Sequence, residues 1–339
     1  MLGNISFQDR TRKWWMVLVA VVAVVTILSG CTTPQPKVYR VGILSGTEDF
    51  LPIADGLRTK MAELGYVEGE NIIYDVQSAN ADPAAERAMA EKLVNDKVDV
   101  IVSLATESSV IAKEVTQGTD IPVVFVFAGL EGADLVASVR EPGGNITGVR
   151  YPGPEQITRR LEILLEISPN VRRVWIGYDK NYPNAVPTLA VLRPLAVAKG
   201  IELVEAPCAT IEEMAADLAA RAQSTDLGVD AIILMPDSFN HTPAGLEVIS
   251  KFAAEQKVPL GGSFLYTVQL GAVFGNANDF VKMGELAAPL VDKVLKGTPA
   301  GTIPVVTPEQ DLWINYKVAQ ELGLTIPEGL LRQAAEIIR

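Results

Sequence analysis

Hydrophobic and polar residues alternate in a regular way along the chain from Val38 onward. Short runs of β-branched and aliphatic residues, such as 100–103 and 123–126, are separated by longer stretches in which hydrophobic residues recur at helical spacing. Strands that alternate with helices are typical of βαβ units and of a parallel sheet. The pattern therefore predicts an α/β fold.

The first half of the chain predicts one sheet with its helices. The expected strands are 39–44, 72–76, 100–103 and 123–126, and the expected helices are about 52–64, 84–95 and 108–117. Asp82 and Pro83 match an N-cap and the first position of the second helix. Gly65 follows the first helix, at the position where a left-handed residue commonly ends one.

The second half repeats this plan. The expected helices are 155–167, 186–199, 211–221 and 244–255, and the expected strands are 173–178, 202–205, 231–235 and 258–261. Thr210 and Glu213 form the two ends of a capping box, which indicates where the third of these helices begins. Two similar lobes are therefore expected.

A turn-rich stretch at 142–154, with one short strand at 146–151, separates the two halves. The C-terminal part predicts a strand at 272–274, a helix at 280–295, a strand at 311–314 and final helices, too few elements for a third core. We therefore expect two doubly wound parallel-sheet lobes joined by a hinge of several crossovers. The N-terminal lobe would hold 38–148 plus about 270–300, and the C-terminal lobe about 149–269 plus 301–339.

The N-terminus has the features of an export signal. Basic residues at 10, 12 and 13 precede an apolar run at 14–28, which is shorter than most membrane-spanning helices. Leu28-Ser29-Gly30-Cys31 resembles a bacterial lipobox. We predict a lipoprotein signal peptide at 1–30, lipid on Cys31 and a short tether at 31–37. An uncleaved signal anchor and a cleaved signal without lipid are the alternatives.

Composition narrows the possible functions. The net charge is −12, which argues against nucleic-acid binding because phosphate contacts need a basic surface. One histidine and two cysteines are too few for a zinc site, and no nucleotide-binding or nucleophile motif is present, so we expect no metal, no cofactor and no catalysis. If Cys31 is lipidated, Cys208 has no disulfide partner.

Several segments, taken in order, resemble a known family. They are 64–71 (LGYVEGEN), 99–102 with Thr106, 121–125, 142–148 (PGGNITG), 230–233, 236–237, 295–297, Asn315 and 322–327. In these segments the chain is similar to the ABC transporter substrate-binding proteins related to tryptophan- and tyrosine-binding lipoproteins. The resemblance runs along nearly the whole mature chain.

The resemblance implies a type I periplasmic-binding-protein fold and a lipid-tethered extracytoplasmic receptor. Such a receptor, expected to be a monomer, closes on a small ligand and delivers it to a membrane permease with its ATPase. An amino acid, possibly aromatic, is the favoured ligand. One segment departs from the family: 126–136 lacks the Asp-Pro pair that usually follows the fourth strand, which bears on the ligand class.

Candidate ligand contacts come from the carboxyl ends of the expected strands, where open α/β sheets bind ligands. One wall would carry Ser45, Thr47, Thr106 and Gly129. A hydroxyl beside a helix N-terminus can help to receive an anionic group, and this is the role expected of Thr106. Thr106 could equally be an N-cap without contact to ligand.

The opposite wall would carry Tyr178, Asn184, Asp237 and Ser238, which correspond to second-lobe contacts in the family. Asn276, which follows the expected strand at 272–274, is a further candidate. Asp237 could pair with a ligand amine or cap the helix region near Pro243. Tyr178 could stack on a ring or pack in the hinge.

Three other functions remain open at the level of sequence. A two-lobed α/β cleft can host catalysis, because fold does not fix function. A lipid-anchored sensor that signals to a membrane receptor would use the same ligand-induced closure. An importer component for a sugar or nucleoside would differ only in its contacts.

Overall fold

The computed structural model describes residues 37–79, 82–182 and 185–339. The expected signal peptide, Cys31 and nearly all of the expected tether lie outside these residues. Contacts divide the chain into Met1–Val38 and Tyr39–Arg339, and every strand named below belongs to the second unit. Within the described ranges, no helix is long and apolar enough to cross a membrane.

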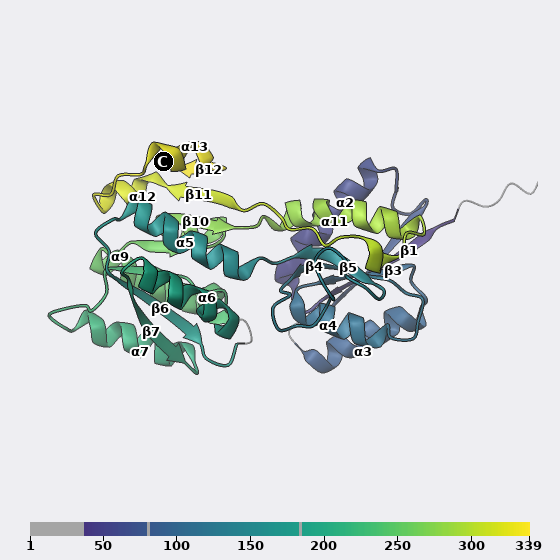
Figure 1. Cartoon of the computed structure of the whole chain (residues 1–339), viewed down its shortest axis with the longest axis horizontal. Helices are drawn as coiled ribbons and strands as arrows, with labels where there is room; N and C mark the ends of the chain where they lie inside the picture. The colour runs from purple at the N-terminus through teal and green to yellow at the C-terminus, as the bar shows by residue number, and fades with distance from the viewer. Residues whose placement is uncertain (1–36, 80–81, 183–184) are drawn as a thin grey trace, which may run out of the picture. The chain divides into compact units, whose positions relative to one another are not determined.

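The first sheet has five parallel strands in the order β2-β1-β3-β4-β5 (Figure 1). These strands are β1 (Tyr39–Ser45), β2 (Ile72–Ser78), β3 (Val100–Leu104), β4 (Val123–Ala128) and β5 (Ile146–Arg150). Because side chains alternate along a strand, β3 sends Val100 and Val102 into one hydrophobic cluster and Ile101 into another. The sheet is therefore covered on both faces, as a parallel sheet requires.

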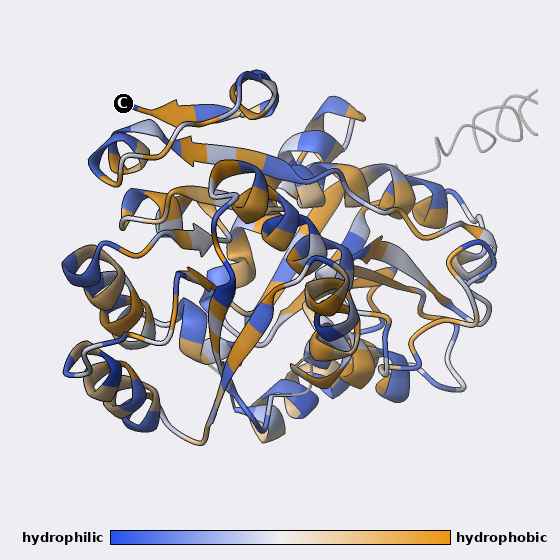
Figure 2. Ribbon diagram, turned by 60° about the vertical axis from the view of Figure 1, so that its left-hand side comes forward, coloured by the Kyte–Doolittle hydropathy of each residue, from blue (hydrophilic) through white to orange (hydrophobic). Residues whose placement is uncertain are grey.

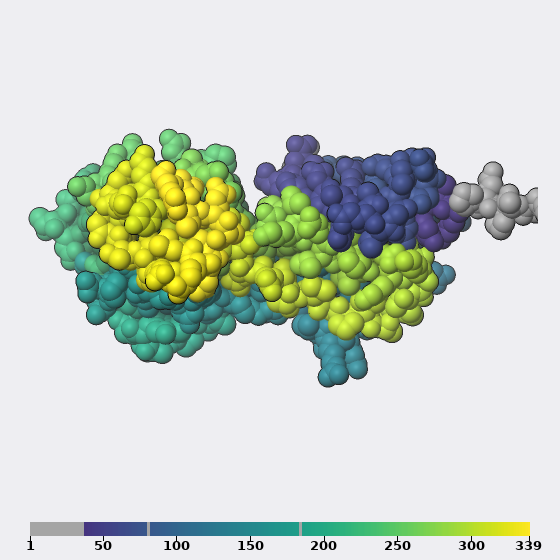
Figure 3. Space-filling view, turned by 90° about the horizontal axis from the view of Figure 1, so that it is seen from above, coloured from purple at the N-terminus to yellow at the C-terminus, as the bar shows by residue number. Residues whose placement is uncertain are grey.

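Helices from distant parts of the sequence cover this sheet. One face is covered by α2 (Leu51–Glu63) and α11 (Phe280–Leu295), which lie side by side (Figures 1 and 3). The other face is covered by α3 (Pro83–Asn95) and α4 (Thr106–Val115). Two short 3₁₀ turns, η1 (Glu48–Phe50) and η2 (Ala300–Thr302), adjoin the strands.

The second sheet has seven strands in the order β12-β11-β10-β9-β8-β6-β7, and β11 runs antiparallel to β10. These strands are β6 (Arg173–Asp179), β7 (Glu202–Cys208), β8 (Ala231–Ile233), β9 (Leu260–Gly262), β10 (Phe274–Ala277), β11 (Asp311–Asn315) and β12 (Glu336–Ile338). All the other neighbouring pairs are parallel.

Helices also cover both faces of the second sheet. One face holds α5 (Gly153–Ile167), α6 (Ala185–Ala198), α12 (Tyr316–Glu321) and α13 (Glu328–Gln333), and the other holds α7 (Ile211–Ala222) and α9 (Pro243–Gln256). Two short helices, α8 (Ser238–His241) and α10 (Leu265–Gln269), follow strand ends. The helices carry hydrophobic and hydrophilic residues together, as expected for elements buried on one side (Figure 2).

The chain crosses between the two sheets three times. The crossings lead from β5 into α5, from β10 into α11, and from the segment after η2 into β11. Two hydrogen bonds join them: Gln156 Nε2 donates to Asn278 Oδ1 in a buried contact (2.5 Å), and Asn278 Nδ2 donates to the Glu309 carbonyl in a partly buried one (2.7 Å). The expected pair of doubly wound α/β lobes with several crossovers describes this topology.

The expected domain boundaries stay a prediction, and strand pairing differs from them at two places. Residues from about 270 were assigned to the N-terminal lobe, but β10 pairs with β9 and β11 in the second sheet. Residues from 301 were assigned to the C-terminal lobe, but Val306 bridges to Val149 of β5. The chain therefore changes sheets at Asn278 and after Val306.

Candidate functional site

The candidate contacts on the first sheet lie at the carboxyl ends of β1, β3 and β4. Ser45 ends β1 and is buried, and its Oγ donates to the Thr47 carbonyl oxygen at 2.6 Å. Thr106 is the first residue of α4, and its Oγ1 accepts from the Gly129 amide at 3.0 Å. The structure therefore brings Thr106 and Gly129 together and ties the loop after β4 to the start of α4.

The candidates on the second sheet are less uniform. Asp237 is buried and Ser238 is exposed at the start of α8, while Asn276 is buried within β10. Tyr178 lies in the hydrophobic cluster beneath α5 and α6, and its hydroxyl donates to Glu205 at 3.0 Å. Tyr178 thus packs within the second sheet, beside the edge strand β7, and not in the crossings between the sheets. Asn184 lies outside the described residues.

Asp237 caps α8 instead of the helix region near Pro243, which Thr242 caps. Its carboxylate accepts from the Asn240 backbone amide at 3.2 Å and from Asn240 Nδ2 at 2.9 Å. Burial raises the pKa of Asp237 to about 6, and the hydrogen bonds from Asn240 offset part of that rise.

An aromatic cluster gathers at the strand ends and contains residues from both sheets. Its members are Phe50, Phe127, Tyr151, His241, Phe264, Tyr266 and Phe280. Phe127 is the next-to-last residue of β4, and its ring centroid lies 4.6 Å from that of Tyr151 and 6.5 Å from that of Phe264. Aromatic residues placed in this way form a surface suited to a planar apolar group.

The centre of the cluster is held by an unusual backbone. Phe127 has φ = 63°, in the left-handed region, and the pairing of β4 with β5 shifts register at this residue. Non-glycine residues in this conformation carry strain and persist where surrounding contacts hold them. Here the ring contacts with Tyr151 and Phe280 provide such a constraint.

Polar groups adjoin the aromatic rings. Tyr266 Oη lies 2.9 Å from His241 Nδ1. Burial lowers the pKa of His241 to about 3, and the charge of Arg160 adds to this fall, so the imidazole is neutral at pH 7. Burial also raises the pKa of Tyr151 and Tyr266, and the same Arg160 charge offsets part of the rise.

Arg160 of α5 is 1% exposed and lies at the carboxyl end of the second sheet. Its Nε donates to the Asn276 carbonyl (2.9 Å), its Nη1 to the Leu234 carbonyl (3.1 Å) and its Nη2 to Gln156 Oε1 (3.3 Å). All three acceptors are neutral.

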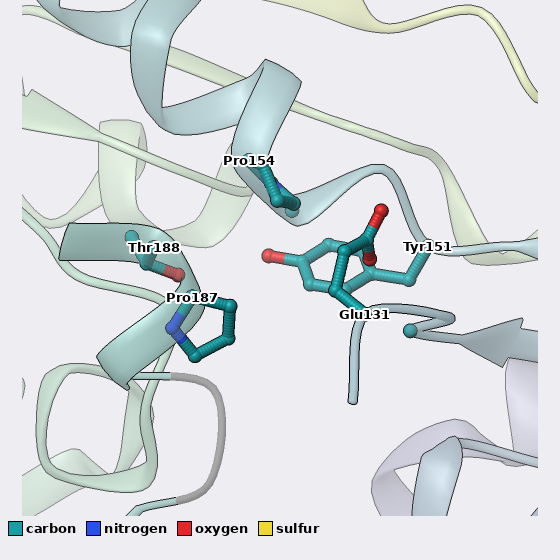
Figure 4. Close-up of a pocket in the computed structure, with 7 residues that line it drawn as sticks. Glu131, Tyr151, Pro154, Pro187 and Thr188 are labelled. Carbon is teal, nitrogen blue, oxygen red and sulfur yellow. The ribbon is translucent and has the colours of Figure 1, made fainter. Parts of the chain in front are cut away.

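A small pocket opens beside Tyr151 and is shown in Figure 4. It is lined by Gly129, Glu131, Tyr151, Gly153, Pro154, Pro187 and Thr188. The hydroxyl of Tyr151 points toward Pro187 and Thr188 (Figure 4). Of the residues expected from sequence, Gly129 lines this pocket.

Electrostatic coupling indicates that both walls approach the same region. The pKa of Tyr182 is raised, first by burial and then by the charges of Glu107, Tyr151 and Asp237. Glu107 belongs to α4 on the first sheet, whereas Asp237 begins α8 on the second. Across the described ranges, no three His, Cys, Asp or Glu side chains could hold a metal ion.

Sequence reasoning missed the aromatic cluster and Arg160. These aromatic residues could have been found by the same rule that selected Thr106, because Tyr151 and Phe264 follow strand ends and Phe127 is the next-to-last residue of β4. Arg160 lies within α5, where the expected helix offered no reason to separate it from the partly exposed Arg159.

The comparisons with known proteins agree with one another. A family model described as ABC transporter substrate binding protein matches residues 43–338. A curated protein named tyrosine-binding protein, from Clostridioides difficile, is 28% identical over 335 residues, which cover 93% of each chain.

Two solved structures are similar over 89% of this chain and 100% of theirs. A conserved domain protein from Vibrio cholerae has 29% identity and a TM-score of 0.76. The ABC domain from Streptococcus pneumonia, solved in complex with L-Trp, has 26% identity and a TM-score of 0.74.

Proposed function

The chain belongs to the ABC transporter substrate binding protein family, and from this premise we propose that it captures an aromatic amino acid for an ABC importer. Binding proteins of this kind work by recognition without catalysis and act outside the cytoplasm. The ligand would lie at the strand ends of both sheets and be delivered to a permease with its ATPase.

The aromatic cluster is the observation that carries the choice of ligand. Phe127 and Tyr151 from the first sheet lie within ring-contact distance of each other, and Phe127 also approaches Phe264 from the second sheet. An indole or phenol ring placed among them would bury a large apolar area and gain ring contacts. The similar proteins named for tyrosine or solved with L-Trp support the same choice.

The candidate contacts divide into two groups on the basis of their surroundings. Thr106, Gly129 and Asp237 remain the proposed polar contacts, together with Ser45, Thr47, Ser238, Asn276 and Asn184 around them. Tyr178 already uses its hydroxyl on Glu205, so we assign it to the support of the second wall. The missing Asp-Pro pair is compatible with this ligand because Phe127 supplies an aromatic surface at that place.

Lipid attachment at Cys31 is part of the same proposal and rests on the basic flank, the short apolar run and the lipobox-like residues. Cys31→Ala should abolish labelling of the protein by a fatty-acid analogue in growing bacteria. Unchanged labelling of the variant would contradict the anchor.

The ligand is tested by a binding screen on the full-length chain in detergent. L-Tyr and L-Trp should raise the melting temperature, because a ligand at 100 times its dissociation constant adds about 2.7 kcal/mol to the free energy of unfolding. Sugars, nucleosides and aliphatic amino acids are the comparison set. Stabilisation by one of these alone, and by no aromatic amino acid, would reject the proposed ligand.

A further inference from the structure

The buried guanidinium of Arg160 lacks a charged partner. Its three acceptors are two backbone carbonyls and the side-chain oxygen of Gln156. In the part of the chain that the structure describes, no carboxylate lies within ion-pair distance of Arg160. By contrast the neighbouring Arg159 pairs with Glu162 and Glu166 at the surface.

A buried cation without a counter-ion is costly, and burial lowers the pKa of Arg160 accordingly. Arginine remains charged all the same, because its guanidinium is not deprotonated in proteins. The group has five N–H donors, and the three described hydrogen bonds leave two of them. The site therefore has both charge and donor capacity that the described residues do not use.

The position of the guanidinium relates it to the proposed ligand site. Leu234 follows β8 and Asn276 lies in β10, so Arg160 bridges the carboxyl ends of these strands. Its charge also acts on Tyr151, Tyr266 and His241 of the aromatic cluster. Asn276 adds a buried Oδ1 that has no hydrogen-bond partner among the described residues.

We propose that Arg160 receives the carboxylate of the ligand, so that the site selects aromatic compounds that carry a carboxylate. This proposal deepens the proposed function and rests on it. A carboxylate can accept two N–H groups of one guanidinium and supplies the missing counter-charge. Gln156, which Asn278 holds by a hydrogen bond, fixes the orientation of the guanidinium from its other side.

Pairs of ligands that differ only in the carboxylate test this proposal on the unchanged protein. Calorimetry on the full-length chain in detergent compares L-Tyr with tyramine and L-Trp with tryptamine. We expect the amines, which lack the carboxylate, to bind about 30-fold or more weakly, as is typical when one partner of a buried charge pair is removed. Equal affinity within each pair would overturn the role of Arg160.

Arg160→Gln gives a second measurement, with Arg159→Gln as the matched control on the same helix. The Arg160→Gln protein should lose most of its affinity for L-Tyr but little of its affinity for tyramine, whereas Arg159→Gln should change neither. A purely structural role would weaken both ligands equally and would also overturn the proposal. If Arg160→Gln does not fold, the ligand pairs still decide.

Desaminotyrosine separates this proposal from the proposed function, because it keeps the ring and the carboxylate but lacks the amine. Binding of desaminotyrosine without binding of L-Tyr or L-Trp would reject the amino acid ligand and support the role of Arg160. Binding of no carboxylate in this set would overturn both.

Discussion

At the scale of single residues, burial changes what a strand-end position can do. Sequence patterns identify Asp237 as a residue that follows a strand, but they do not show that it is 3% exposed or that Asn240 occupies its carboxylate. The burial of Asp237 depends on the tertiary contacts of α8, and this helix has only four residues, too few to show in a sequence pattern. The strand-end position of this candidate could therefore be predicted from sequence, whereas the state of its side chain could not.

The raised pKa of Asp237 makes the stability of the protein depend on pH. Because burial raises this pKa from 3.8 to about 6, the folded state binds the proton more tightly than the unfolded state does. The contribution of Asp237 to stability is thus fully present below about pH 4 and is lost as the pH rises through 6, a change of about 3 kcal/mol. Asp237→Asn removes this dependence.

Chemical denaturation of both proteins from pH 4 to pH 7 checks this prediction. The free energy of unfolding of the wild type should fall relative to that of Asp237→Asn by about 2.4 kcal/mol across the range, most of the full change. A constant difference between the two proteins would show that the carboxyl group titrates at its ordinary pKa in the folded state.

At most positions an alanine variant is more stable than a glycine variant, and the left-handed backbone at Phe127 should reverse this order. Phe127→Ala and Phe127→Gly both lose the ring contacts, but glycine also relieves the strain at φ = 63°. Phe127→Gly should therefore be more stable than Phe127→Ala by about 1 kcal/mol in chemical denaturation. Phe50, in the same cluster with φ = −90°, is the control. Phe50→Ala should be more stable than Phe50→Gly. The same order of stability at Phe50 and Phe127 would refute the argument.

At the scale of elements, length and periodicity decide what can be predicted. The strands of both sheets apart from β12, and helices such as α5 and α11, agree with expectation within a few residues, because buried runs and amphipathic repeats are strong local signals. The short helices α8 and α10 and the strand β12 were missed. A helix of four or five residues is too short to show a repeated hydrophobic spacing. The strand β12 forms because β11 offers an edge with which it can pair.

The contact between α2 and α11 also follows from tertiary structure, and two glycines make it possible. A Cβ built on Gly284 would overlap the backbone carbonyl of Ile53, and one on Gly56 would overlap that of Val281. Gly284→Ala should therefore force the helices apart and lower the free energy of unfolding by about 1–3 kcal/mol, although alanine is the better helix former.

Gly329→Ala in α13 is the matched control, since a Cβ there meets no atom within 4 Å. This substitution should be neutral or stabilise by up to about 1 kcal/mol. Both variants are compared by urea denaturation. Similar effects in the two helices would mean that close packing does not govern Gly284.

At the scale of the whole molecule, the three crossings between the sheets depend on one buried amide. Asn278 accepts from Gln156 of the first crossing and donates to the carbonyl of Glu309 in the third. Periodicity along the sequence cannot reveal such a link, because it joins segments that are more than one hundred residues apart. The closure on a ligand that is expected of a two-lobed binding protein would need the connecting segments to be held in register while they bend.

Asn278→Ala should loosen all three crossings together. Removing the amide leaves the buried Gln156 amide without this partner and frees the Glu309 carbonyl, which should cost about 1–3 kcal/mol. Hydrogen exchange should become faster at 151–156, 278–280 and 307–311, while the strands of both sheets keep their protection.

Asn145→Ala is the control: Asn145 Nδ2 also makes two hydrogen bonds, to Thr116 and Ile121 within the first sheet's own connections. The Asn145→Ala protein should lose stability without faster hydrogen exchange at the crossings. If exchange becomes faster to the same extent throughout the Asn278→Ala protein, Asn278 supports the fold in general and not the crossings in particular.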